Sequence, residues 1–250
     1  MKQLQGILGG IWKVYAMIIL SVTLTLMYPI YAFFLRKRSS YKYAFRILQG
    51  HTLFVLSVVG VFLKIEGKEH LKNLGPCVLT PNHSSYLDIL ILYRVVPEYF
   101  VFMGKHTLKT IPIFNIFFKD MNIAVNRKSS VSGKQALERC SEELQSGHGV
   151  TIFPEGTIPD DAPNLLRFKF GAFKLAIENQ VPIVPITFLT NYKRLQLSSS
   201  LFSGKAGPGW SKVIVNKPIP TVGLTHEDLL ALQERVHACI LNNLKQHGCR

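Results

Sequence analysis

The chain has 250 residues, of which 48% are hydrophobic, and its 29 Lys and Arg residues against 15 Asp and Glu give a formal net charge of +14. A basic and apolar protein of this kind suits an anionic membrane surface, and no zinc-ligand spacing or aromatic-rich basic ribbon indicates nucleic acid as a partner. The four cysteines, Cys77, Cys140, Cys239 and Cys249, have no paired spacing, which argues against a disulfide framework and a zinc site and favours a reducing compartment.

A long apolar run occupies residues 11–35, interrupted by Lys13 and Pro29 and followed directly by a basic cluster at residues 36–38. About 20 apolar residues are enough to cross a bilayer, so this run is long enough. A second apolar run, residues 53–63, is too short to cross comfortably alone. Two membrane arrangements fit: one spanning helix, or a helical hairpin that dips into one leaflet, each with the basic cluster on the cytoplasmic face. A buried helix of a soluble protein is the alternative.

We therefore expect residues 1–64 to form N-terminal membrane helices and residues 65–250 to form the catalytic domain, entered through a polar link at residues 65–75. Short strands alternate with helical patterns from Pro76 onward, which predicts an α/β fold with a mostly parallel sheet covered by helices on both faces. The expected strands are residues 77–80, 99–103, 122–125, 149–153, 183–188 and 212–216. The expected helices are residues 84–95, 131–146 and 171–178, and a final helix that opens at Thr225 with a capping box to Asp228.

His83 lies where an expected strand ends and the next helix begins. In α/β sheets, catalytic groups collect at this position because loops at the carboxyl ends of parallel strands form a crevice. Asp88 follows five residues later, and its carboxylate can reach an imidazole nitrogen if the intervening loop folds back. A carboxylate on one nitrogen makes the other a better base, so the pair indicates a catalytic dyad; a structural hydrogen-bonded pair is the alternative.

Further polar side chains follow other expected strands and belong to the same rim of the sheet. Glu155 and Thr157 flank Gly156, where a carboxylate, a hydroxyl and a close backbone approach can hold a polyol; an ordinary turn with an exposed Glu is the alternative. Arg127 offers a planar fork suited to phosphate, and Lys105 is a weaker second candidate. A surface ion pair is the alternative for Arg127.

At these residues the chain resembles the glycerolipid acyltransferase family, which includes the 1-acylglycerol-3-phosphate O-acyltransferases. The resemblance extends over about residues 65–220. The motifs that carry it are Asn-His-four residues-Asp at residues 82–88, an apolar strand ending in Arg at 123–127, Phe-Pro-Glu-Gly-Thr at 153–157, and an apolar Val-Pro-Ile segment at 181–186. One position departs from the family pattern, because Ile158 follows Glu-Gly-Thr where the family commonly has Arg or a hydroxyl residue. Arg167 or Lys169 is a candidate to supply that charge.

The resemblance implies a membrane-bound enzyme that moves a fatty acyl group from acyl-CoA or acyl carrier protein to 1-acylglycerol-3-phosphate, giving phosphatidic acid. Its partners would be membrane lipids, the lysophospholipid acceptor and the acyl donor, with no metal or bound cofactor. The setting we expect is a bacterial inner membrane, with the catalytic domain on the cytoplasmic side.

The resemblance also implies roles for individual residues. His83 would be the general base that deprotonates the acceptor hydroxyl, a step that contributes about 10²–10⁴ in rate, and Asp88 would orient it. The backbone around Gly156 or the loop after Pro81 would donate to the developing oxyanion. The substrate-binding residues would be Lys105 and Arg127 for the phosphate, and Glu155, Gly156 and Thr157 for the glycerol.

Other functions remain open on the sequence. The departure from the family pattern that begins at Ile158 is compatible with a different acceptor, such as a lyso-aminolipid or another lysophospholipid. A catalytically silent membrane protein that binds lipid is a further alternative from another class. A Ser or Cys hydrolase of thioesters has less support, because the chain contains no Gly-x-Ser-x-Gly motif.

Overall fold

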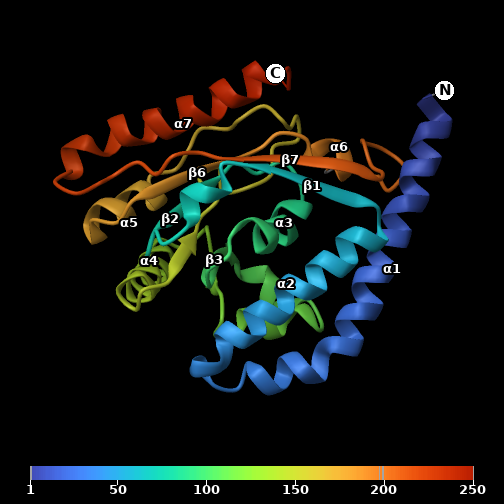
Figure 1. Ribbon diagram of the computed structural model, residues 1–250, viewed down its shortest axis with the longest axis horizontal. Coiled ribbons are helices and arrows are strands. Elements are labelled where there is room, and N and C mark those ends of the chain that lie inside the picture. The colour runs from blue at the N-terminus through green and yellow to red at the C-terminus, as the bar shows by residue number, and fades with distance from the viewer. Residues whose placement is uncertain (1, 197, 199, 250) are drawn as a thin grey trace.

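The computed structural model describes residues 2–196, 198 and 200–249, with side chains from Gln5 onward. Within that range the centre of the protein is one seven-stranded sheet (Figure 1). Its strands are β1 (Val61–Glu66), β2 (Val78–Pro81), β3 (Phe100–Lys105), β4 (Ile123–Val125), β5 (Gly149–Thr151), β6 (Ile183–Phe188) and β7 (Gly209–Val215). Their order is β1-β7-β6-β2-β5-β3-β4, and all neighbours are parallel except the β6–β7 pair. The prediction of a mostly parallel sheet is confirmed.

Helices cover both faces of this sheet (Figure 1). The α-helices are α1 (Lys2–Phe34), α2 (Tyr41–Val58), α3 (Leu87–Val95), α4 (Ser130–Gln145), α5 (Gly171–Asn179), α6 (Asn191–Arg194) and α7 (Leu229–Gln246). Short 3-10 helices lie at Arg38–Ser40, Lys68–Leu71, His106–Thr110, Phe114–Phe118 and His226–Asp228. Helices α1, α2 and α3 pack on one face, and α4, α5 and α7 pack on the other.

The core consists of two apolar clusters, one on each face of the sheet. Successive side chains of a strand point to opposite faces, so Leu79 joins the cluster that contains Phe45 of α2, whereas Val78 joins the cluster that contains Cys140 of α4. Every side chain of β2 and β6 is buried. The two clusters explain why these strands read as continuous apolar runs, since each is covered on both faces.

The second apolar run, residues 53–63, is only partly helical. Helix α2 ends at Val58, and Gly60 takes a left-handed conformation with φ +73° that allows the chain to turn. The next residues enter β1, which pairs with β7. The boundary expected after Lys64 therefore falls inside a strand of the catalytic sheet.

One side of helix α1 packs against the rest of the protein, and the other side is exposed. It is the one helix in the described range that is long and apolar enough to cross a membrane, over Gln5–Phe34. On the protein side, Trp12 Nε1 donates to the Val59 carbonyl at 3.0 Å and Lys13 Nζ donates to the Ser203 carbonyl at 2.6 Å. On the other side it exposes large apolar residues that include Ile7, Leu8, Ile11, Met17, Ile18, Val22, Leu26 and Phe33.

The remaining expected elements are present, with ends displaced by a few residues. The capping box between Thr225 and Asp228 is confirmed and opens the turn before α7. Helix α3 starts at Leu87 rather than at Ser84, which leaves residues 83–86 as a loop. Strand β1, helix α6 and the 3-10 helices between β3 and β4 were not predicted, because short elements carry little periodicity.

Candidate active site

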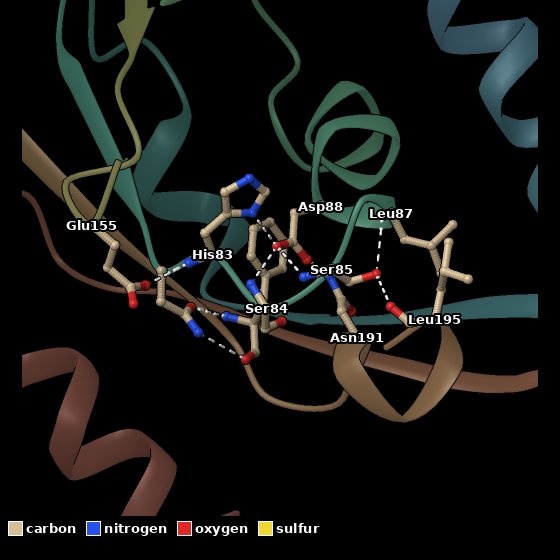
Figure 2. A network of polar contacts seen from close by, with 10 residues as sticks. His83, Ser84, Ser85, Leu87, Asp88, Glu155, Asn191 and Leu195 are labelled. Carbon is tan, nitrogen blue, oxygen red and sulfur yellow. Dashed lines mark hydrogen bonds and ion pairs between the residues drawn. The ribbon is translucent and has the colours of Figure 1, made fainter. Parts of the chain in front are cut away.

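The loop after β2 brings His83 and Asp88 together, as the spacing predicts (Figure 2). Asp88 lies in the first turn of α3, and its Oδ2 is 2.8 Å from His83 Nδ1. With a carboxylate on Nδ1, that nitrogen carries the proton and Nε2 keeps its lone pair. No described residue forms a hydrogen bond with Nε2, which points away from Asp88 in Figure 2. The pair therefore presents one free basic nitrogen.

Asp88 is fully buried and accepts from several donors besides the imidazole. The backbone N–H groups of Ser84 and Ser85 donate to Oδ2 at 2.7 and 2.9 Å, and Asn191 Nδ2 donates to Oδ1 at 2.6 Å. The Ser211 hydroxyl in turn donates to Asn191 Oδ1. A buried carboxylate needs such donors to offset its desolvation, and they also fix its orientation. Asp88 is thus a rigid support for the imidazole.

The His83 ring is held from a second direction by Phe153. The ring centroids are 4.0 Å apart with an interplanar angle of 24°, so the two rings stack. The His83 side chain retains an exposed fraction of 12%. The carboxylate fixes Nδ1 and the phenyl ring fixes the plane, so Nε2 is the ring nitrogen left for a substrate.

Glu155 lies on the other side of His83 from Asp88, and its carboxylate contacts backbone N–H groups (Figure 2). It is 2% exposed, and its two carboxylate oxygens accept from the backbone N–H of His83 at 2.7 Å and of Leu166 at 2.9 Å. Burial raises the pKa of Glu155 to about 7, although the two N–H donors act in the opposite direction. In this position Glu155 holds the chain at His83 in place; contact with the acceptor glycerol stays a prediction.

The raised pKa makes stability depend on pH through Glu155. Its pKa rises from 4.5 to about 7 on folding, so the folded state keeps the proton longer and stability falls as pH rises between these values. We expect the unfolding free energy to decrease by on the order of 3 kcal/mol from this group. Urea unfolding in detergent at a series of pH values from 4.5 to 8 measures this decrease in the unfolding free energy. The Glu155→Gln variant should lack this component, and an unchanged pH profile in the variant would contradict the assignment.

Gly156 permits a close approach of two cationic side chains. It has φ +75°, and a Cβ added there would lie 2.8 Å from Lys169 Nζ, so any other residue would be strained and would displace the amine. The Arg127 guanidinium donates to the Gly156 carbonyl. Of the two candidates proposed for the charge missing at Ile158, the structure places Lys169 beside this turn.

A cavity of about 400 Å³ opens between the rim and the N-terminal helices. Four of the predicted site residues line it, namely His83, Lys105, Arg127 and Thr157. The rest of its wall is mostly apolar and includes Leu24 of α1, Val55 of α2, Leu90 of α3, and Phe117, Phe118 and Ile158. Asp88 and Glu155 lie buried behind this surface. The site therefore joins a base and two cations to a slot suited to a hydrocarbon chain.

Sequence reasoning missed the support of the dyad by Asn191 and Ser211, and the stacking of Phe153 on His83. Asn191 lies 103 positions from Asp88, and Ser211 belongs to a strand that reverses direction relative to β6. A polar residue shortly after the buried strand β6 was the one available signal. Phe153 was recognised as part of a motif, but its contact with the imidazole was not.

The fold and the site together define an α/β protein with a hydrogen-bonded His–Asp pair at an apolar cavity. Residues 62–189, about half of the chain, match the protein-family model described as Acyltransferase. The chain belongs to this acyltransferase family, which confirms the resemblance that the motifs indicated.

Individual relatives agree with this membership. Human 1-acyl-sn-glycerol-3-phosphate acyltransferase beta is 31% identical over 201 residues, which cover 75% of this chain and 70% of that protein. The chloroplastic 1-acyl-sn-glycerol-3-phosphate acyltransferase BAT2 of Brassica napus is 36% identical over 157 residues, covering 62% of this chain and 44% of that protein.

A solved structure shows the same fold. The crystal structure of the 1-acyl-sn-glycerophosphate (LPA) acyltransferase PlsC from Thermotoga maritima matches with a TM-score of 0.77 at 20% identity. The match covers 100% of this chain and 99% of that one. The N-terminal helices are thus included in the shared architecture.

Proposed function

We propose that this acyltransferase moves a fatty acyl group from a thioester donor, acyl-CoA or acyl carrier protein, to the hydroxyl of 1-acylglycerol-3-phosphate, giving phosphatidic acid. The observation that carries the proposal is the free Nε2 of His83 at the mouth of an apolar cavity that Arg127 and Lys105 also line. A base, a phosphate-binding cation and a hydrocarbon slot are the parts that this reaction requires. The names of the relatives support the same acceptor.

The reaction needs no protein nucleophile. His83 Nε2 takes the proton of the acceptor hydroxyl as its oxygen attacks the thioester carbonyl, and a tetrahedral intermediate forms. Asp88 stabilises the imidazolium that results. The intermediate collapses with cleavage of the C–S bond, and the imidazolium returns its proton to the leaving thiolate. The proposed chemistry requires neither a metal nor a bound cofactor.

The oxyanion of the intermediate needs a hydrogen-bond donor. The backbone N–H groups after Pro81 do not serve, because those of His83, Ser84 and Ser85 are already bonded to Glu155 and Asp88. The Gly156 N–H donates to the Phe153 carbonyl at 3.0 Å. In the described part of the chain nothing accepts from the Thr157 N–H, and we assign it to the oxyanion.

The acceptor phosphate would bind Arg127, assisted by Lys105, while the Thr157 hydroxyl contacts the glycerol. We expect Arg127→Gln to raise KM for 1-acylglycerol-3-phosphate by about 10–100-fold, because it removes a charge-assisted contact. Initial rates over a range of acceptor concentrations measure this. The adjacent exposed Lys128→Gln is the matched control, since Lys128 does not line the cavity. Equal effects of the two substitutions would contradict a specific phosphate contact.

A panel of acceptors tests the proposed function itself. Purified full-length protein in detergent receives labelled acyl-CoA or acyl carrier protein together with lysophosphatidic acid, other lysophospholipids or lyso-aminolipids. Product on lysophosphatidic acid supports the proposal. Product on another lysolipid would reassign the acceptor and accords with the apolar Ile158 at the cavity wall. No product from either donor, with folded protein, would favour a silent lipid-binding protein.

For the membrane arrangement, we propose that α1 lies with its exposed apolar side in one leaflet. Its other side is fixed to the catalytic domain through Trp12, Lys13 and Tyr31, whose ring centroid is 4.9 Å from that of Phe117. A helix held along this length cannot cross the bilayer independently of the domain. The active-site cavity, which α1 lines through Leu20 and Leu24, would then open towards lipid. We place the catalytic domain on the cytoplasmic side of a bacterial inner membrane.

A further inference from the structure

A second and larger cavity lies at the opposite end of the parallel strands from His83. It has a volume of about 780 Å³ and is lined by residues at the starts of strands, including Cys77, Phe100 and Gly149. Its mouth carries Lys42 and Arg46, which lie in the first turns of α2. The proposed acyl transfer uses none of these residues.

The charges around this cavity are not balanced. Buried Glu143 accepts from Arg38 at 2.9 Å and contacts His148 Nδ1 at 2.8 Å, so this carboxylate is already occupied. Lys42 and Arg46 have no carboxylate within 4.0 Å among the described residues, although exposed Glu98 also lines the cavity. Lys42 Nζ lies 5.3 Å from the centroid of the Tyr43 ring, but neither cation has a carboxylate partner in the described range.

The placement of these cations on α2 is itself unfavourable. Lys42 and Arg46 are separated by four positions in the helix, so their charges lie on one face and repel each other. Lys42 also belongs to the first turn, where the helix dipole disfavours a cation. An anion between the two side chains would relieve both effects.

The second cavity is separate from the active-site cavity. Phe45 and Phe100 line the second cavity, whereas Tyr93 and Phe102 line the first. These rings pack directly on one another, with centroids 5.5 Å apart for Phe45 and Tyr93 and 4.9 Å apart for Phe100 and Phe102. The two cavities share no lining residue, and His83 belongs to the first.

The surroundings indicate which anion fits. The apolar surface of α1 continues to Phe33, which is 64% exposed, and the basic residues at 36–38 follow within one turn. The mouth thus lies where an apolar surface gives way to a charged one, as at the headgroup level of a bilayer. Inside, apolar side chains such as Leu71 and Leu74 alternate with polar ones such as Asn73.

We propose that this second cavity binds the phosphate group of an anionic phospholipid of the surrounding membrane, with Lys42 and Arg46 as its cationic contacts. The polar and apolar walls receive the glycerol and the first part of the acyl chains. The bound lipid fixes the turn between α1 and α2 against the catalytic domain at a position remote from the chemistry.

Binding of short-chain lipids to the full-length protein in a neutral detergent tests the proposal. The probes are dihexanoyl phosphatidylglycerol, dihexanoyl phosphatidylcholine and inorganic phosphate, each titrated by calorimetry. We expect phosphatidylglycerol to bind the wild type at least tenfold more tightly than phosphatidylcholine or inorganic phosphate. The double variant Lys42→Gln, Arg46→Gln should weaken phosphatidylglycerol binding by about tenfold or more, because it removes two charge-assisted contacts.

Two control variants make the result specific. The double variant Arg36→Gln, Lys37→Gln removes the same charge from neighbouring residues that do not line the cavity, and it should bind within about twofold of the wild type. Arg127→Gln, in the active-site cavity, should also retain binding. Arg46→Gln alone gives a smaller loss and serves if the double variant is unstable.

Several outcomes would overturn the proposal. Equal losses in the two double variants would assign binding to the general basic surface, and loss in Arg127→Gln would assign it to the active site. Inorganic phosphate binding as tightly as the lipid would indicate a free-phosphate site instead. Since the readout is binding, failure here is distinguishable from failure of the acyl-transfer proposal.

Discussion

Replacing His83 with alanine is expected to lower kcat for acyl transfer by about 10²–10⁴, the usual contribution of a positioned general base. The reason is that Nε2 of His83 is the basic atom exposed at the cavity, while Nδ1 is held by Asp88. The variant should fold, because Asp88 keeps its donors from Ser84, Ser85 and Asn191. Single-turnover rates with saturating donor and acceptor measure the effect on chemistry.

The matched control is His106→Ala, which removes an exposed imidazole from the 3-10 helix after β3. His106 does not line the active-site cavity, so the variant should keep the wild-type rate. A thermal melt of both variants separates loss of chemistry from loss of fold. If His83→Ala retained more than a tenth of the wild-type rate, the base would have to be another group.

The contact between His83 and Asp88 could be predicted because the two residues are close in the sequence. Asn82, His83 and Asp88 lie within one strand-to-helix connection, and polar residues at the carboxyl ends of parallel strands commonly line a crevice. The same reasoning found Arg127 and Thr157 on the rim, since parallel strands bring their ends to one edge. The structure places these residues around one cavity.

What could not be predicted depends on contacts between distant segments. Glu155 is of a residue type that often contacts ligands. In the structure, however, its two carboxylate oxygens accept hydrogen bonds from the backbone N–H groups of His83 and Leu166. Strand β1 is recognisable only through its pairing with β7, because its apolar residues continue the run that ends α2. Both cavities are likewise formed by elements far apart in the chain, so neither has a sequence pattern of its own.

Asp88 and Asn191 form a buried hydrogen-bonded pair. Exchanging these two residue types should separate the structural role of Asp88 from its electrostatic role. In Asp88→Asn, the amide oxygen can still accept from Ser84 and Ser85, but the new amide N–H₂ faces the Nδ2 donor of Asn191. We expect this single variant to lose about 1–3 kcal/mol of stability from the unsatisfied buried donors. Its kcat should fall by about 10²–10⁴, because the imidazolium loses its counter-charge.

The double variant Asp88→Asn, Asn191→Asp restores a donor facing an acceptor, and the Ser211 hydroxyl still has a carboxylate oxygen to donate to. Its melting temperature should therefore recover towards that of the wild type. Its rate should not recover, because the carboxylate now contacts the amide at position 88 and no longer contacts His83 Nδ1. Melting curves and single-turnover rates of the wild type, the single variant and the double variant measure the two effects separately. Recovery of both quantities would mean that a negative charge anywhere in this buried network is sufficient, and that direct contact with the imidazole is not what activates the base.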